Sequence, residues 1–253
     1  MRICCAQITQ MWNDVRTAFV LAEEAVLRAV SADAELVVFS EQYATGWRVN
    51  GCISEKVTGT EVKEQWLSLA REHGVAVVGS YMRELPHGLP QNAMLVAGPD
   101  GEVITEYAKI HLFAPGGEKK RYTPGDMPVS FSYKGVTFGC AICFDLLFPE
   151  LFRDYLRSGC ECMLVQAAWP AARVADWELL LRVRALENRG YVVAAGCLGY
   201  DSISETEYSG RGVVCDPEGR IVADAGGFVG GCCAEVDGEA VRELRERWGI
   251  WPE

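Results

Sequence analysis

The middle of the chain carries the stretch Gly139-Cys-Ala-Ile-Cys-Phe-Asp-Leu-Leu-Phe-Pro-Glu150. Its first residues complete an apolar run that begins at Val136, and this run predicts a strand that leads into Cys143. Pro149 suits the first position of a helix, because the backbone N–H that proline lacks would have no partner inside the helix there. Gly159 then ends that helix. A strand that turns directly into a helix is a building unit of α/β folds.

The same alternation of strands and helices extends towards both ends of the chain. Apolar residues recur every three or four positions from Val15 to Val30, which predicts a helix capped by Asn13 or Asp14. A second helix is expected from Glu61 to His73, before Gly74. Further helices are predicted over 174–189 and 239–248. The predicted strands are 3–9, 35–39, 75–78, 92–97, 102–107, 129–133, 136–142, 162–166, 191–197 and 231–236, with hairpin turns at 99–101, 134–135 and 217–219.

No low-complexity linker or change of composition divides the chain, so we expect one domain over residues 1–253. A helix must bury its apolar face against another layer, and hairpins occur beside strand–helix–strand units. The expected fold is therefore α/β, with sheets covered by helices. Segments near 43–58, 114–128 and 199–209 are predicted loops, which we expect to set specificity.

Charge and hydropathy exclude several classes of function. The 24 Lys and Arg residues are outnumbered by 35 Asp and Glu residues, so the net charge is −11. Without a basic cluster, the chain lacks what binding to nucleic acid or to an anionic membrane surface requires. No apolar run approaches the roughly 18 residues of a spanning helix. The first residues enter a strand directly, without a signal-peptide pattern, so we expect a cytoplasmic protein.

The chain has eleven cysteines, most of them inside apolar runs, where a free thiol behaves as a small hydrophobe. We expect neither a disulfide scaffold nor a metal site. The spacing of Cys140, Cys143, Cys160 and Cys162 does resemble that of zinc ligands. However, Cys140 and Cys143 lie three apart in a predicted strand and so point to opposite faces. A dithiol redox protein that uses these two cysteines remains an alternative.

Three reactive side chains each follow an apolar strand, where rigid backbone holds a group that the loop leaves open. Cys143 is a candidate nucleophile, Glu41 a candidate base if burial raises its pKa, and Lys109 a candidate partner for an oxyanion. Each position taken alone also fits a plainer interpretation, namely an inert buried thiol, a solvated carboxylate or a surface charge. His111 would share a face with Lys109 in an extended segment, so a Cys–His hydrolase is an alternative.

Three ordered motifs resemble those of the nitrilase superfamily of carbon–nitrogen hydrolases. They are Phe39-Ser-Glu41, Lys109-Ile-His-Leu-Phe113 and Cys143-Phe-Asp-Leu-Leu-Phe-Pro-Glu150, with further matches in 166–170, 177–188 and 209–219. The resemblance implies a four-layer α-β-β-α sandwich whose protomers pair as a homodimer or a higher homo-oligomer. It also implies no metal and no organic cofactor.

The same resemblance implies a triad of Glu41, Lys109 and Cys143. A second glutamate usually follows the lysine motif, and Glu118 matches it at a spacing that is about two residues longer than in some relatives. Glu118 could equally be a solvated charge. The implied oxyanion site combines Lys109 with the backbone N–H of Phe144. Trp169 either lines the pocket or packs in the core. Four further matching residues are expected to brace the active-site segments: Glu150, Arg184, Glu187 and Asn188.

The sequence around the nucleophile narrows the substrate class. Nitrile-hydrolysing members tend to carry Cys-Trp-Glu, whereas this chain has Cys143-Phe-Asp145, which favours an amidase for a small linear amide. Many omega-amidases carry an arginine four residues after the cysteine, where this chain has Leu147. An acidic substrate would therefore need Arg173 or another cation. An omega-amidase and an N-carbamoyl-amine hydrolase remain alternatives, followed by a nitrilase or an inactive binding member.

Overall fold

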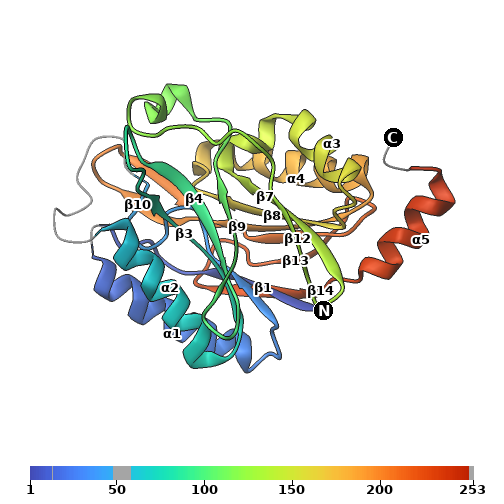
Figure 1. Ribbon diagram of the computed structural model, residues 1–253, viewed down its shortest axis with the longest axis horizontal. Helices are drawn as coiled ribbons and strands as arrows, with labels where there is room; N and C mark the ends of the chain where they lie inside the picture. The colour runs from blue at the N-terminus through green and yellow to red at the C-terminus, as the bar shows by residue number, and fades with distance from the viewer. Residues whose placement is uncertain (13, 48–57, 251–253) are drawn as a thin grey trace.

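Two six-stranded sheets form the centre of the computed structural model, which describes residues 1–12, 14–47 and 58–250 (Figure 1). The first sheet has the order β14-β1-β2-β3-β4-β5 and the second β13-β12-β9-β8-β7-β6. The first comprises β1 (Arg2–Gln7), β2 (Leu36–Val38), β3 (Ala76–Arg83), β4 (Gln91–Ala97), β5 (Val103–Ala108) and β14 (Gly230–Glu235). The second comprises β6 (Ser130–Tyr133), β7 (Val136–Ile142), β8 (Cys162–Ala167), β9 (Tyr191–Gly196), β12 (Val213–Cys215) and β13 (Ile221–Asp224).

Helices cover the outer face of each sheet. The first sheet carries α1 (Val15–Val30) and α2 (Gly59–His73), and the second carries α3 (Pro149–Arg157) and α4 (Val174–Asn188), while α5 (Gly238–Trp248) follows β14. Three buried apolar clusters fill the spaces between these layers. The predicted α-β-β-α arrangement is therefore confirmed. No helix of the described residues has the length and hydropathy that crossing a membrane requires.

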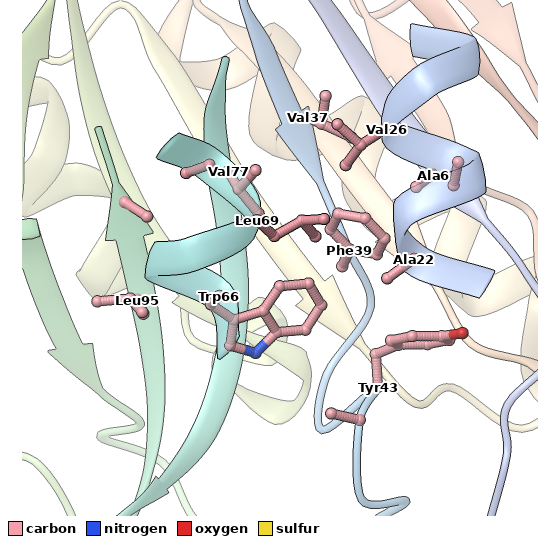
Figure 2. Packing of buried hydrophobic residues seen from close by; sticks show 14 of the residues in the cluster. Ala6, Ala22, Val26, Val37, Phe39, Tyr43, Trp66, Leu69, Val77 and Leu95 are labelled. Carbon is pink, nitrogen blue, oxygen red and sulfur yellow. The ribbon is translucent and has the colours of Figure 1, made fainter. Parts of the chain in front are cut away.

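The central strands are apolar on both faces, because helices cover one face of each sheet and the other sheet covers the opposite face. Val37 of β2 and Val77 of β3 pack against α1 and α2, together with Val26 and Trp66 (Figure 2). The neighbouring Leu36 and Val38, with the opposite orientation, pack between the two sheets. Such strands are continuous apolar runs, which is why they can be recognised in the sequence.

Local capping explains where two predicted helices begin. Asp14 caps α1 by accepting a hydrogen bond from the Thr17 N–H at 3.1 Å, as predicted, whereas Asn13 lies outside the described residues. Helix α2 starts two residues before the predicted position, because Thr58 and Glu61 form a capping box. Thr58 N–H donates to Glu61 Oε2 at 2.7 Å, and Glu61 N–H donates to Thr58 Oγ1 at 3.1 Å.

Two expectations were wrong. Cys4 of β1 and Cys233 of β14 face each other in the antiparallel register and form a disulfide, although no disulfide was expected. The segment predicted as a loop over 199–209 contains a hairpin of β10 (Leu198–Asp201) and β11 (Thr206–Ser209). Asp201 stabilises its turn by accepting hydrogen bonds from Ile203 N–H at 3.0 Å and Ser204 Oγ at 2.8 Å. The other described cysteines are free thiols.

Candidate active site

Cys143 occupies a tight turn between β7 and α3. It is the first residue of a 3₁₀ helix, η3 (Cys143–Leu147), and its φ of +50° is unusual for a residue with a side chain. The buried carboxylate of Asp145 holds the turn by accepting from Ile142 N–H at 2.9 Å and from Tyr107 Oη at 2.7 Å. The sulfur is thereby presented at the end of a buried strand, a position that suits a nucleophile.

His111 contacts this turn rather than the thiol. Its backbone N–H donates to Asp145 Oδ1 at 2.9 Å, and its Nδ1 lies 2.9 Å from the same oxygen. Its ring stacks on Phe148, with ring centres 3.6 Å apart. This geometry favours a bracing role for His111 over a Cys–His pair.

Glu41 and Lys109 meet in the interior of the protein. Glu41 follows β2 and Lys109 follows β5, and the two strands belong to the same sheet. Lys109 Nζ lies 2.8 Å from Glu41 Oε1, and neither residue is more than 1% exposed. The other oxygen of Glu41 accepts a hydrogen bond of 3.0 Å from the N–H of Ala168, just after β8. The carboxylate of Glu41 therefore links the two sheets.

Glu118 is buried beside the same ammonium, so it is not the solvated charge that was considered. Its Oε2 lies 2.9 Å from Lys109 Nζ. Its carboxylate also accepts from the Phe113 N–H at 2.5 Å and from Trp47 Nε1 at 3.2 Å. A segment of two 3₁₀ turns, η1 (Ala114–Gly116) and η2 (Glu118–Lys120), brings Glu118 into this position.

Asn92 is a member of the cluster that the sequence analysis missed. Its Nδ2 lies 2.8 Å from Glu41 Oε1 and 3.2 Å from Glu118 Oε1, so one amide contacts both carboxylates. Its Oδ1 accepts from Gln42 Nε2 at 2.7 Å, which fixes the orientation of the amide. The available signal was a polar residue in second position of β4, where it directly precedes the apolar residues of the strand and is buried with them.

The charges of the cluster shift the pKa values of its members in opposite directions. Burial alone would lower the pKa of Lys109, but the charges of Glu41, Cys143 and Glu118 outweigh burial and raise it. Burial would raise the pKa of Glu118, yet Lys109 and the hydrogen bonds lower it. The pKa of the Cys143 thiol rises well above its usual value, through burial first and then through Glu41, with Lys109 offsetting part of the rise. At neutral pH these directions leave the Cys143 thiol protonated, Lys109 as an ammonium and Glu118 as a carboxylate.

A cavity of about 360 Å³ opens beside the sulfur. Its volume is at the lower end of the range typical of small-molecule sites, about 300–1,000 Å³. Cys143, Phe144 and Trp169 line it. Trp169 also packs against the buried Trp177 in a tilted arrangement, with ring centres 5.6 Å apart, so both interpretations of Trp169 apply. The remaining described lining residues are Trp47, Phe113, Pro115, Gly116, Gly117, Ala168, Pro170, Arg173, Ser204, Thr206 and Tyr208.

Comparison with known proteins identifies the family. A model described as carbon-nitrogen hydrolase matches residues 2–246. The chain belongs to the carbon–nitrogen hydrolase family. This carbon–nitrogen hydrolase is 31% identical to 2-oxoglutaramate amidase from Bacillus subtilis over 217 residues, which cover 85% of this chain and 83% of that protein. It is also 31% identical to an omega-amidase from Xenopus tropicalis over 243 residues, which cover 93% and 87%.

Solved structures share the fold of this carbon–nitrogen hydrolase. A superfamily protein from Xanthomonas campestris, with an arsenic adduct in its active site, aligns with a TM-score of 0.89 at 27% identity over 98% of this chain and 95% of that chain. A second match is an amidase variant from Nesterenkonia sp. AN1 with an acetamide group added at its active-site cysteine. It aligns with a TM-score of 0.86 at 25% identity, over 98% of this chain and 96% of that chain. The protein is therefore a hydrolase that acts on C–N bonds, as predicted.

Proposed function

We propose that the protein is an amidase that hydrolyses a small linear amide to a carboxylate and ammonia through a thioester on Cys143. One observation carries the proposal: a buried carboxylate–ammonium pair, Glu41 and Lys109, adjoins a thiol that lines a cavity. A nucleophile, a base and a cation at one site are what acyl transfer requires.

In the first step, the sulfur attacks the amide carbonyl carbon while Glu41 takes the thiol proton. A base is needed because the raised pKa keeps the thiol protonated at neutral pH. The charge that develops on the carbonyl oxygen is stabilised by the Lys109 ammonium and the backbone N–H of Phe144. Phe144 is the second residue of η3, and such early N–H groups have no partner inside the helix.

In the second step, the C–N bond breaks and the proton held by Glu41 passes to the leaving nitrogen. Ammonia departs and the acyl group remains on sulfur as a thioester. Glu41 then removes a proton from water, whose oxygen attacks the thioester carbonyl carbon. The C–S bond breaks, the proton held by Glu41 returns to the sulfur of Cys143, and the carboxylic acid leaves and ionises by giving its proton to the solvent. Glu118 and Asn92 hold Lys109 and Glu41 in place through these steps.

The test is ammonia release by purified wild-type protein and by Cys143→Ala, over omega-amides, aliphatic amides, carbamoyl amines and nitriles. We expect wild-type activity on an amide, loss of it in Cys143→Ala, and an acyl adduct on the wild type by intact-protein mass spectrometry. Cys140→Ala is the matched control, since Cys140 is buried in β7 away from the cavity. Near-normal rates in Cys143→Ala would refute the proposal, and a requirement for both thiols would favour the redox alternative.

An omega-amidase is the second candidate within this chemistry. It is supported by the two relatives named 2-oxoglutaramate amidase and omega-amidase. The homodimer or higher homo-oligomer that the family resemblance implies stays a prediction. Sedimentation equilibrium of the purified protein would measure its oligomeric state.

A further inference from the structure

Arg173 stands at the cavity beside the nucleophile. It is the last residue of η4 (Ala171–Arg173), immediately before α4, and its side chain is exposed. The backbone around it is fixed, because Arg173 N–H donates to Pro170 O at 2.9 Å and Trp169 Nε1 donates to Arg173 O at 2.8 Å. Arg173 and Cys143 line the same cavity, so a single small molecule can contact both.

The guanidinium is held by aromatic rings rather than by an acid. Its Cζ lies 5.5 Å from the centre of the Phe113 ring and 5.7 Å from that of Trp169. No hydrogen bond or ion pair of this guanidinium occurs among the residues that the structure describes. A guanidinium stacked on aromatic faces keeps the N–H groups in its plane available to oxygen acceptors.

The charge of Arg173 stands out in the cavity wall. Among the described residues that line the cavity, Arg173 is the one with a charged side chain. Most of the others are aromatic or lack a polar side chain. Leu147, the position at which many omega-amidases would carry arginine, does not line the cavity. The cation in the cavity wall therefore belongs to η4 and not to the turn that carries Cys143.

We propose that Arg173 binds a carboxylate at the far end of the substrate, so that the preferred substrate is the monoamide of a short dicarboxylic acid. This inference rests on the proposed amidase function. The amide lies at Cys143, the aliphatic chain contacts the ring of Phe144, and the carboxylate reaches the exposed rim at Arg173. The planar guanidinium fork matches the two oxygens of a carboxylate.

The experiment compares amides of equal chain length with and without the carboxylate: succinamate against butyramide, and glutaramate against pentanamide. The proteins are the wild type, Arg173→Gln, Arg173→Lys and Arg28→Gln. Arg28 is the matched control, since it is a half-exposed arginine of α1 that pairs with Glu24 at 3.8 Å. The readout is kcat and KM for ammonia release.

We expect the wild type to prefer the carboxylated amides by at least about tenfold in kcat/KM. Arg173→Gln should lower this preference about tenfold, mainly through KM, because a charged hydrogen bond to the bound substrate is lost. Arg173→Lys should retain part of the preference, since it keeps the charge but not the fork. Arg28→Gln should change the preference less than twofold.

Three outcomes would overturn the proposal: no wild-type preference, the same preference in Arg173→Gln as in the wild type, or an equal loss on neutral and carboxylated amides. The last would mean that Arg173 only supports the aromatic wall. Cys143→Ala is measured on all four amides in parallel. If it abolishes every activity while Arg173→Gln keeps the preference, the amidase mechanism stands and only the role of Arg173 fails.

Discussion

Lys109 Nζ lies 2.8 Å from Glu41 Oε1, and neither side chain has exposed surface. A buried ion pair is costly to form, and removal of one partner leaves a charge that the interior cannot solvate. Here a single ammonium serves two carboxylates, because Glu118 lies 2.9 Å away on another segment. We therefore expect the stability of the site and the proposed chemistry to depend on the same three charges.

Loss of the ammonium should cost more stability than loss of one carboxylate. In Lys109→Met two buried carboxylates lose their counter-charge, and we expect the free energy of unfolding to fall by about 3–5 kcal/mol. Glu41→Gln keeps the shape and leaves Lys109 paired with Glu118, so its loss should be smaller. Urea denaturation measures both, and both variants should lack amidase activity. Equal stability losses would contradict this account.

The reactivity of Cys143 should report the charges around it. Because its pKa is raised well above the usual value, the rate of alkylation by iodoacetamide should still increase with pH above 9. The negative charge of Glu41 contributes to the rise and Lys109 opposes it. Glu41→Gln should therefore shift the rate profile to lower pH, and Lys109→Met to higher pH. Mass spectrometry follows the adduct, with Cys143→Ala as background, and shifts in the same direction would refute the assignment.

Much of the site could be predicted from the sequence because its central residues follow apolar strands. Cys143 comes directly after β7 and Glu41 three residues after β2, so the strand ends position both side chains in the site. Asn92 left no comparable local pattern. Its role depends on contacts with Glu41 and Glu118, which are separated from it by 51 and 26 positions in the sequence. The Cys4–Cys233 pair spans 229 positions, and the spacing of eleven cysteines does not reveal such a pairing.

Asn92 should be intolerant of a charge. Asn92→Asp is nearly isosteric, but it replaces the donor between Glu41 and Glu118 with a third carboxylate. We expect a fall in kcat of at least about 100-fold and a lower free energy of unfolding, because an unpaired buried charge is costly. Asn92→Ala removes the donor without adding a charge and should be less damaging. Activity in Asn92→Asp above that of Asn92→Ala would contradict the bridging role.

Glu118 should contribute to stability at neutral pH and lose that contribution in acid. Its pKa is lowered in the folded protein, so the contribution is full above the ordinary value near 4.5 and is lost as the pH falls through the folded pKa. Glu118→Gln should unfold more easily at pH 7, and the difference from the wild type should shrink below about pH 4. Denaturant midpoints at several pH values measure this. A constant difference would exclude the linkage.

The disulfide between β1 and β14 should stabilise the protein only under oxidising conditions. Cys233→Ser removes it, and we expect a loss of about 2–4 kcal/mol relative to Cys232→Ser, the neighbouring control with a free thiol. A phosphine reductant should bring the unfolding midpoint of the wild type towards that of Cys233→Ser. If reductant leaves the wild-type midpoint unchanged, the disulfide does not form in solution.

The pairing of β1 with β14 also has a consequence for biosynthesis. The two strands are adjacent in one sheet, yet their paired cysteines are separated by 229 positions of sequence. During translation β1 leaves the ribosome long before β14, so one edge of β1 stays unpaired while most of the polypeptide is made. Unpaired edges attract other chains. Slow synthesis or high concentrations of nascent protein should therefore favour aggregates, and chaperones that shield β1 should increase the yield of soluble enzyme.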